Sequence, residues 1–287
     1  MGDGPVVALR FAVALCLALA FGLPLLGVGR TAALRWSMIW LVALAAALSA
    51  LSLLALVAAM AGTDVFPVDR TTLAMVVGET SIGTAFVVRF VALAVAFVSL
   101  LWPRPGPGLL RAATGIALAT LAWTGHGAMD EGMRGRVHLI ADIIHLLAAG
   151  AWIGAIAALL VAVMVTRRTG SDVTAVRTAL GAFAATGTAL VGSIVVSGAI
   201  NGWLILGPDG FARVLTTDYG VLLMVKVAAF GAMVLLAAAN RWLLTPMLRD
   251  RPSRTLPWVR ASLTLELGCA VAILALVARL GMLSPQG

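Results

Sequence analysis

Charged residues are scarce in this 287-residue chain. Asp, Glu, Lys and Arg together make up 11% of it, whereas apolar types make up 62% and the mean hydropathy is +1.07. A water-soluble domain of this length does not need so much apolar surface, and in lipid the backbone satisfies its own polar groups by forming helices. The composition therefore excludes a soluble globular protein and predicts an all-α, polytopic membrane protein.

The signals of several other classes are also missing. The net charge is +8, but the basic residues stand singly at the ends of apolar runs, so we expect no nucleic-acid partner. The two cysteines, Cys16 and Cys269, lie inside apolar runs and form no CxxC pair, which predicts buried apolar side chains. No GxxxxGK[ST] loop occurs and no soluble stretch is long enough to hold a nucleotide. We therefore expect no enzyme and no nucleotide-driven pump.

Long apolar runs fill most of the chain. Because a transmembrane helix needs about 20 apolar residues, the sequence predicts an eight-helix bundle forming a single membrane domain over residues 1–287. The first run carries Asp3 in its leader and ends without a clean A-x-A site, so we expect a retained span rather than a signal peptide. The predicted spans are 5–28, 34–61, 80–102, 109–126, 138–165, 173–200, 219–244 and 258–281.

The loops differ in charge, and this difference predicts an orientation. The loops that follow the first, third, fifth and seventh spans hold twelve arginines against two acidic residues, whereas the alternate loops are acidic or mixed. The positive-inside rule places the arginine-rich loops in the cytoplasm. Both termini are therefore expected on the outer side.

A short internal similarity links the two halves of the chain. Thr80-Ser-Ile-Gly83 is followed by Arg89, and Thr217-Asp-Tyr-Gly220 is followed at the same spacing by Lys226. Each segment begins a span that runs from outside to inside. The similarity indicates two parallel four-helix repeats, an arrangement known from transporters.

Histidine is rare, and its three copies fall within one stretch of 20 residues: His126, His138 and His145. Polar side chains are costly at membrane depth and commonly mark a pathway or a site. The spacing of His138, Asp142 and His145 places all three on one helical stripe, with His145 about 10 Å deeper than His138. His126 closes the preceding span at the same outer surface. Together these residues predict an outward-facing site.

The neighbouring loop adds two thioethers, Met129 and Met133. Imidazoles and thioethers together suit copper, and soft methionine ligands favour Cu(I) over Cu(II). Asp142 would then orient a metal-bound imidazole from behind, or would itself carry protons. The alternative hypothesis is structural, with the histidines bonding neighbouring helices and the methionines filling the core.

Four more polar residues lie within spans. Arg89, Lys226 and Glu266 are expensive there unless paired, so we expect ion pairs that lock helices, Lys226 with Glu266 and Arg89 either with an acidic neighbour or reaching outward. A proton relay is the alternative. Asn201 closes its span near the outer face, where it either lines the pocket or belongs to a small-residue helix contact.

These residues resemble the bacterial copper-resistance protein D family, most strongly from about residue 110 to the end. The motifs that carry the resemblance are His126 after Thr-Gly, His138-x3-Asp142-x2-His145 running into Trp152-Ile-Gly154, Ser197-Gly198-x2-Asn201-x-Trp203, Tyr219-Gly220-x5-Lys226, Asn240-Arg241 with Thr245-Pro246, and Glu266.

The resemblance implies an eight-span protein of the bacterial inner membrane that handles copper and commonly imports it. It also implies a separate periplasmic partner, a copper-binding protein of the copper-resistance C type. The leading hypothesis is a copper permease that captures the ion at His126, His138 and His145. Two alternatives use the same residues: a membrane haem protein of the cytochrome b kind, with His126 opposite His145, and an assembly factor that hands copper on without transporting it.

Overall fold

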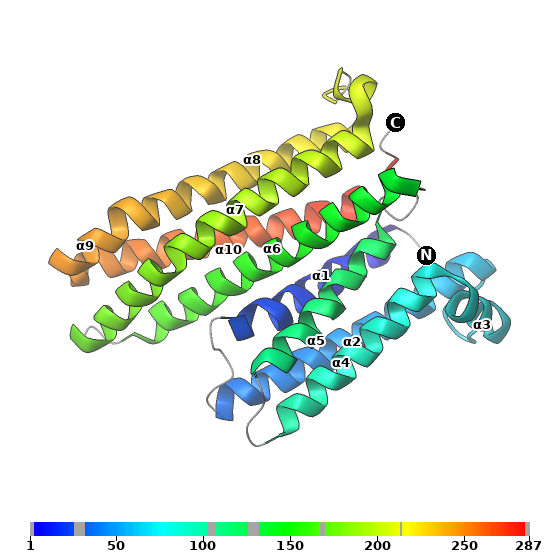
Figure 1. The fold of residues 1–287 in the computed structure, drawn as a ribbon, viewed down its shortest axis with the longest axis horizontal. Coiled ribbons are helices and arrows are strands. Elements are labelled where there is room, and N and C mark those ends of the chain that lie inside the picture. The colour runs from blue at the N-terminus through cyan, green and yellow to red at the C-terminus, as the bar shows by residue number, and fades with distance from the viewer. Residues whose placement is uncertain are drawn as a thin grey trace.

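A computed structural model of the chain describes residues 3–25, 32–102, 107–125, 132–166, 170–212 and 214–284, and these residues form helices and connecting turns without any strand. The helices fall into two groups, an N-terminal half ending at residue 125 and a C-terminal half beginning at residue 132 (Figure 1). The all-α fold predicted from composition is confirmed.

The N-terminal half contains five helices and a terminal 3₁₀ turn. They are α1 (Asp3–Leu25), α2 (Ala32–Ala61), α3 (Arg70–Glu79), α4 (Ser81–Leu101), α5 (Pro107–Ala119) and η1 (Thr120–Thr124). The C-terminal half is built of longer helices and one π-helical segment. They are α6 (Gly132–Val165), α7 (Gly170–Ala212), α8 (Asp218–Ala239), the π segment η3 (Asn240–Leu244), α9 (Thr245–Asp250) and α10 (Pro252–Leu280).

Within the described residues, each of the eight predicted spans coincides with a helix. Within the described part of the chain, seven helices are long and apolar enough to cross a membrane, and the remaining predicted span, 109–126, is the shorter apolar helix Gly108–Thr124. The sequence prediction missed α3 and α9, which are too short to span. Asp69 begins α3, since its carboxylate accepts a hydrogen bond of 2.7 Å from the backbone N–H of Thr72.

Many large apolar side chains face outward, as expected of helices that lie against lipid. Exposed tryptophans occur towards both ends of the bundle, with Trp102, Trp242 and Trp258 at one end and Trp203 at the other. Tryptophan is enriched at both membrane–water interfaces, and this distribution is consistent with the span assignment.

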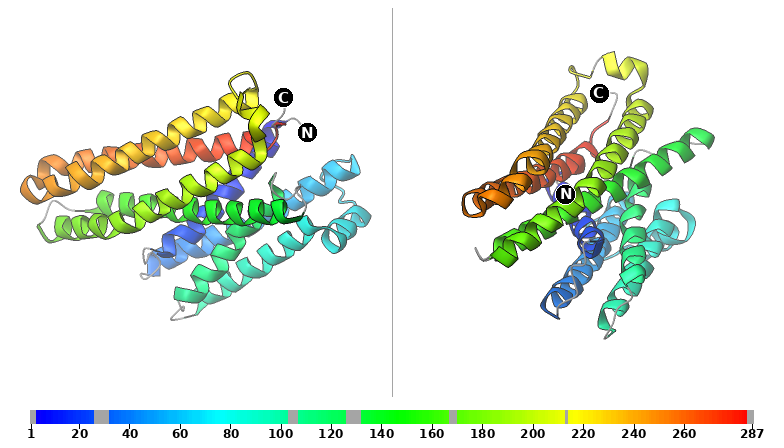
Figure 2. Two further views of the ribbon diagram at one scale, coloured as in Figure 1. Left: turned by 45° about the horizontal axis from the view of Figure 1, so that its top comes forward. Right: turned by 60° about the vertical axis from the view of Figure 1, so that its left-hand side comes forward.

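The two halves meet where α1 crosses α6 on glycines. A Cβ atom added to Gly22 would lie 2.2 Å from the carbonyl oxygen of Gly150, and one added to Gly154 would lie 2.3 Å from the Cα of Gly22. Small residues four apart let helix backbones approach this closely in membranes. The GxxxG segment of α6 is therefore the joint between the halves, whose different tilts are visible in Figure 2.

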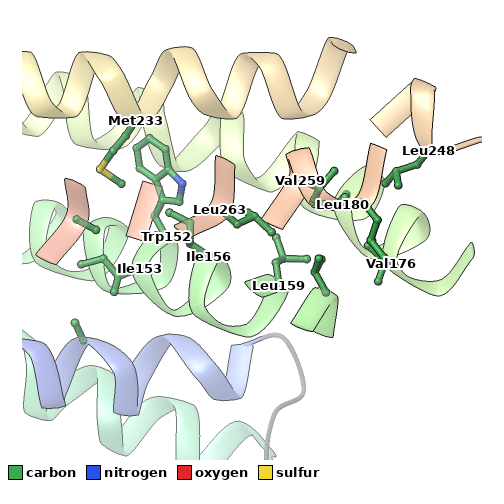
Figure 3. Packing of buried hydrophobic residues seen from close by; sticks show 14 of the residues in the cluster. Trp152, Ile153, Ile156, Leu159, Val176, Leu180, Met233, Leu248, Val259 and Leu263 are labelled. Atoms are coloured by element: carbon green, nitrogen blue, oxygen red, sulfur yellow. The ribbon is translucent and has the colours of Figure 1, made fainter. Parts of the chain in front are cut away.

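Each half has its own apolar core. In the C-terminal half, Trp152 of α6 packs edge-on against Phe230 of α8, with ring centroids 5.6 Å apart. Ile156 and Leu159 continue this row along α6 and meet Leu263 of α10 (Figure 3). This core holds α6, α7, α8 and α10 in fixed register, which is the framework for the polar residues between them.

The internal similarity has a structural counterpart at the start of α4 and α8. Thr80 and Thr217 have nearly the same backbone angles (φ −115°, ψ 149° and φ −115°, ψ 147°), and each hydroxyl accepts a hydrogen bond from the glycine N–H three residues later. A Cβ atom on either glycine, Gly83 or Gly220, would lie within 2 Å of a preceding backbone carbonyl oxygen. The two helices therefore begin with the same cap, which supports a repeat that relates α4 to α8.

Candidate metal-handling site

The predicted stripe on α6 exists and faces the interior of the C-terminal half. His138 is 1% exposed, and Asp142 and His145 are half-buried. The stripe lies near the end of the bundle where α6 and α8 begin, which we call the histidine end. At this end Arg10 of α1 donates hydrogen bonds to the carbonyl oxygens of Thr124 and Gly281, at 3.1 and 2.6 Å.

A hydrogen-bond chain orients the ring of His145. Its Nδ1 lies 3.0 Å from the hydroxyl oxygen of Ser197 on α7, and that hydroxyl donates to the backbone carbonyl of Ser193 at 2.6 Å. A serine has one hydroxyl hydrogen, so when Ser197 donates it to the Ser193 carbonyl, the same hydroxyl accepts from the Nδ1–H of His145. The tautomer inferred from this chain carries its proton on Nδ1 and leaves the lone pair on Nε2 for a ligand.

Gly198 gives the imidazole its place against α7. A Cβ atom at this position would lie 3.3 Å from Cε1 of His145. Any larger residue would therefore push the ring away from Ser197. The Ser-Gly pair seats the ring and fixes its tautomer at the same time.

Asp142 is held from α7 as well. The side-chain amide of Asn201 donates a hydrogen bond of 2.6 Å to Asp142 Oδ1. Gly125, at the end of η1, lies beside the other carboxylate oxygen, since a Cβ atom there would be 3.6 Å from Oδ2. The chain segment that leads into His126 is thus close to Asp142.

Three of the predicted ligands lie in or next to the loop between the halves. His126 and Met129 lie outside the residues that the structure describes. Met133, in the first turn of α6, is 71% exposed and does not contribute its thioether to the buried stripe.

Lys226 extends the cluster from α8. It lies within electrostatic range of both Asp142 and His145. The predicted pair between Lys226 and Glu266 is wrong, because Glu266 is hydrogen-bonded to Asn240. Asn240 is fourteen residues further along the helical segment, about 21 Å away. The lysine therefore balances Asp142 at the histidine end.

Arg89 has a separate environment in the N-terminal half. It is 1% exposed, its Nε donates to the hydroxyl of Thr120 at 2.7 Å, and its guanidinium lies 4.7 Å from the ring centroid of Phe86. The predictions that it would reach outward or bond an acidic neighbour are wrong, because Thr120 supplies a closer acceptor inside the bundle. Arg89 instead ties α4 to η1.

In the described ranges, no three His, Cys, Asp or Glu side chains gather into a group that could hold a metal ion. His138 and His145 are two helical turns apart and follow one another along α6. The described residues thus form a row of polar side chains that runs along α6. Such a row suits an ion that moves from one ligand to the next better than an ion that is held by several ligands at once.

Two family models match the sequence. Residues 1–136 match the model described as "Copper resistance protein D-like, N-terminal domain", and residues 177–280 match "Copper resistance protein D". Copper resistance protein D of Pseudomonas syringae pv. tomato is 41% identical over 222 residues, covering 74% of this chain and 71% of that protein. The chain belongs to the copper resistance protein D family.

Two further relatives differ in length and printed name. Inner membrane protein YebZ of Escherichia coli K12 is 32% identical over 224 residues, or 78% of this chain and 74% of that protein. Copper transport protein CutJ of Bacillus subtilis 168 is 34% identical over 142 residues, or 50% of this chain but 25% of that protein. No solved structure matches the chain.

The His138–His145 stripe lies between the two regions that the family models match, so its role has to be argued from its own geometry. Sequence reasoning found the stripe through its spacing but gave no role to Ser197, whose hydroxyl reaches His145 from another helix.

Proposed function

We propose that this copper resistance protein D family member imports copper across the bacterial inner membrane as a transporter and not as an enzyme. The observation that carries the proposal is the His145 ring, which lies on the same stripe as His138 and whose Nδ1 lies 3.0 Å from the Ser197 hydroxyl. The printed names of the relatives, copper resistance, inner membrane and copper transport, support the cargo and the location.

Copper is the cargo in this proposal and passes along α6. The ion is captured near His126, with Met129 and the exposed thioether of Met133 as first contacts, and moves past His138 towards His145. Thioether and imidazole ligands favour Cu(I).

Lys226 gives the pathway a resting state. Its ammonium group offsets the carboxylate of Asp142 while no copper is present, since an unpaired charge is expensive in the membrane. Because Lys226 balances Asp142, the empty site needs no other cation. A copper ion that reaches His145 then takes the place of the ammonium group as the positive charge near Asp142.

The arginine-rich loops support an orientation with both termini and the histidine end in the periplasm. In that orientation the site opens towards a periplasmic donor, and we propose a copper-binding protein of the copper-resistance C type as that partner. The lipid bilayer is the other environment that the chain contacts, and nucleic acid has no role.

The test compares His138→Ala/His145→Ala with Ile140→Ala/Ile144→Ala. Ile140 and Ile144 border the groove that contains Ser197, so the control that leaves the site untouched is Val161→Ala/Met164→Ala, two exposed residues further along α6. We expect the histidine variant to lose copper binding and uptake into proteoliposomes, the valine-methionine variant to keep both, and the isoleucine variant to show the effect of the groove wall alone. Normal binding and uptake by the histidine variant would overturn the proposal.

The same preparations separate the two alternative functions. A haem protein would show a Soret band after purification, because Nε2 of His145 would be occupied by iron. An assembly factor would bind copper at the histidines but leave the vesicle interior free of it. Either result would replace transport as the function of the stripe.

A further inference from the structure

A second polar cluster lies in the C-terminal half, towards the end that carries Arg241, Arg249, Arg251, Arg254 and Arg260, which we call the arginine end. Here Asn240 of η3 donates its side-chain N–H to Oε1 of Glu266 on α10, and the Ser262 hydroxyl lies 3.5 Å from the same oxygen. Glu266 is 2% exposed and Asn240 is 6% exposed. The cluster is about 21 Å along α8 from Lys226, so it is distinct from the histidine stripe.

Glu266 and Asn240 border a cavity of about 210 Å³ between α6, α7, α8 and α10. Its wall is mostly apolar and includes Trp152, Leu180 and Leu263, which appear together in Figure 3. A cavity of this size has room for several water molecules beside the polar groups. A buried carboxyl group thus has space next to it through which a proton can arrive.

The amide oxygen of Asn240 is buried and has no hydrogen-bond partner among the described residues. Its amide nitrogen is already engaged by Glu266. A carboxylate can only accept hydrogen bonds, whereas a protonated carboxyl group also donates one. A proton on Glu266, or a water molecule that it orders, therefore supplies the missing donor for Asn240.

No cation balances Glu266 within the cavity. The only other charged side chain in the lining is Arg241, and its guanidinium is committed to α7 through the carbonyl oxygen of Ala184 at 3.2 Å and the hydroxyl of Thr188 at 2.6 Å. The residues that α6 and α7 contribute to the lining include no titratable group. A buried carboxylate without a partner is costly, so protonation relieves it.

The backbone at Asn240 is irregular in the way that functional sites often are. Residues 240–244 form a π-helical turn, in which the Thr245 hydroxyl also donates to the Asn240 carbonyl at 2.7 Å. Pro246 follows and lacks the N–H that a regular helix would direct to Trp242. π-Bulges are frequent at functional sites, and this one places the Asn240 side chain against α10.

We propose that Glu266 is a reversible proton-binding site that couples proton movement to transport, with Asn240 as its positioning residue. A hydronium ion in the cavity gives its proton to the free carboxylate oxygen and leaves water, and release reverses this step without any electron transfer. The surrounding carboxyl, amide and hydroxyl oxygens suit a hard ion better than soft Cu(I). The coupling role rests on the proposed transport function, whereas the proton site itself does not.

The site is tested first without copper. Infrared spectra of the full-length protein in liposomes are recorded across a pH series for the wild type, Glu266→Gln and Glu79→Gln, the last altering an exposed glutamate of α3. We expect a protonated-carboxyl band that titrates reversibly, disappears in Glu266→Gln and persists in Glu79→Gln. Asn240→Leu should shift the frequency of this band, because the carboxyl group loses its amide partner.

Three results would overturn the proton site. They are a Glu266→Gln spectrum equal to wild type at every pH, a band that does not change with pH, and a band that sodium ions abolish at constant pH. The first two would show that Glu266 does not exchange protons, and the third would assign the site to a metal cation.

The coupling role is tested by copper uptake into proteoliposomes with and without an imposed pH gradient. Glu266→Gln should bind copper within about twofold of wild type, while its uptake no longer responds to the gradient. A response equal to wild type would overturn coupling. If the wild type bound no copper, the proposed function would fail while the infrared result still decided the proton site.

Discussion

The two halves of the molecule share a helix order and one cap but differ in the polar residues they bury. In the N-terminal half, the buried cation Arg89 is bonded to a hydroxyl and stacked on a phenylalanine. At the equivalent position of the C-terminal half, Lys226 lies within electrostatic range of the Asp142 carboxylate and the His145 imidazole. A single repeated unit thus supports a structural contact in one half and a charged site in the other.

The difference shows that the framework and the chemistry are separable. Thr80 and Thr217 start their helices in the same way, so the cap alone assigns no function to either half. The C-terminal half differs because α6 and α7 place ligand-type side chains near Lys226. Function in this fold therefore depends on which side chains surround the cation at this position, Arg89 in one half and Lys226 in the other.

The joint between the halves should be the most sensitive point. Gly154→Leu would force a side chain into the backbone of α1, and we expect a loss of about 3 kcal/mol or more in the free energy of unfolding. Thermal unfolding in detergent measures it. Gly181→Leu is the control, since nothing lies within 4 Å of a Cβ atom there. Equal melting temperatures for both variants would show that the halves do not depend on this contact.

Removing the ring-orienting hydroxyl should affect copper and little else. Ser197→Ala leaves the His145 tautomer unfixed, and second-shell losses of this kind cost about 10- to 100-fold in metal affinity. Copper titration of the purified protein provides the measurement. Ser49→Ala, a fully buried serine of the N-terminal half, should bind copper like wild type. A similar loss in both variants would remove the functional distinction between the halves.

The equivalent cations should respond differently to neutral replacements. Lys226→Met removes a positive charge near His145, so we expect copper to bind about tenfold tighter and to leave more slowly. Arg89→Met should lower the melting temperature without changing copper affinity. Binding assays and thermal unfolding of the two variants make the comparison, and an unchanged affinity in Lys226→Met would contradict the counter-charge role.

The smallest effect is expected at the shared caps. Thr80→Ala and Thr217→Ala each remove one hydrogen bond to a helix N-terminus, at a cost of about 1 kcal/mol in either half. Chemical or thermal unfolding should therefore place the two variants close together. Only Thr217→Ala should also alter copper affinity, because α8 carries Lys226, whose charge opposes a copper ion at His145. A cap cost found in one half alone would argue against an equivalent repeat.

Much of the fold was predictable because hydrophobic length and helical period are local properties. Runs of apolar residues predicted the seven long apolar helices and the shorter apolar helix Gly108–Thr124, and the four-and-three spacing of His138, Asp142 and His145 predicted their common face. The short helices α3 and α9 were missed because neither is long enough to register as a span. Ser197 was visible as a motif residue, yet its bond to His145 joins positions 52 apart in the chain.

The sequence by itself determined that this is a helical membrane protein with a polar stripe near one end of its C-terminal half. Only the tertiary structure decided which partner each buried charged side chain has. Lys226 lies within electrostatic range of Asp142, Glu266 accepts a hydrogen bond from Asn240, and Arg89 donates one to Thr120. The physical reason is that partner choice depends on how each helix is rotated and how closely it approaches its neighbours. Close contacts such as Gly22 against Gly154 set these quantities, and they form between residues far apart in the chain.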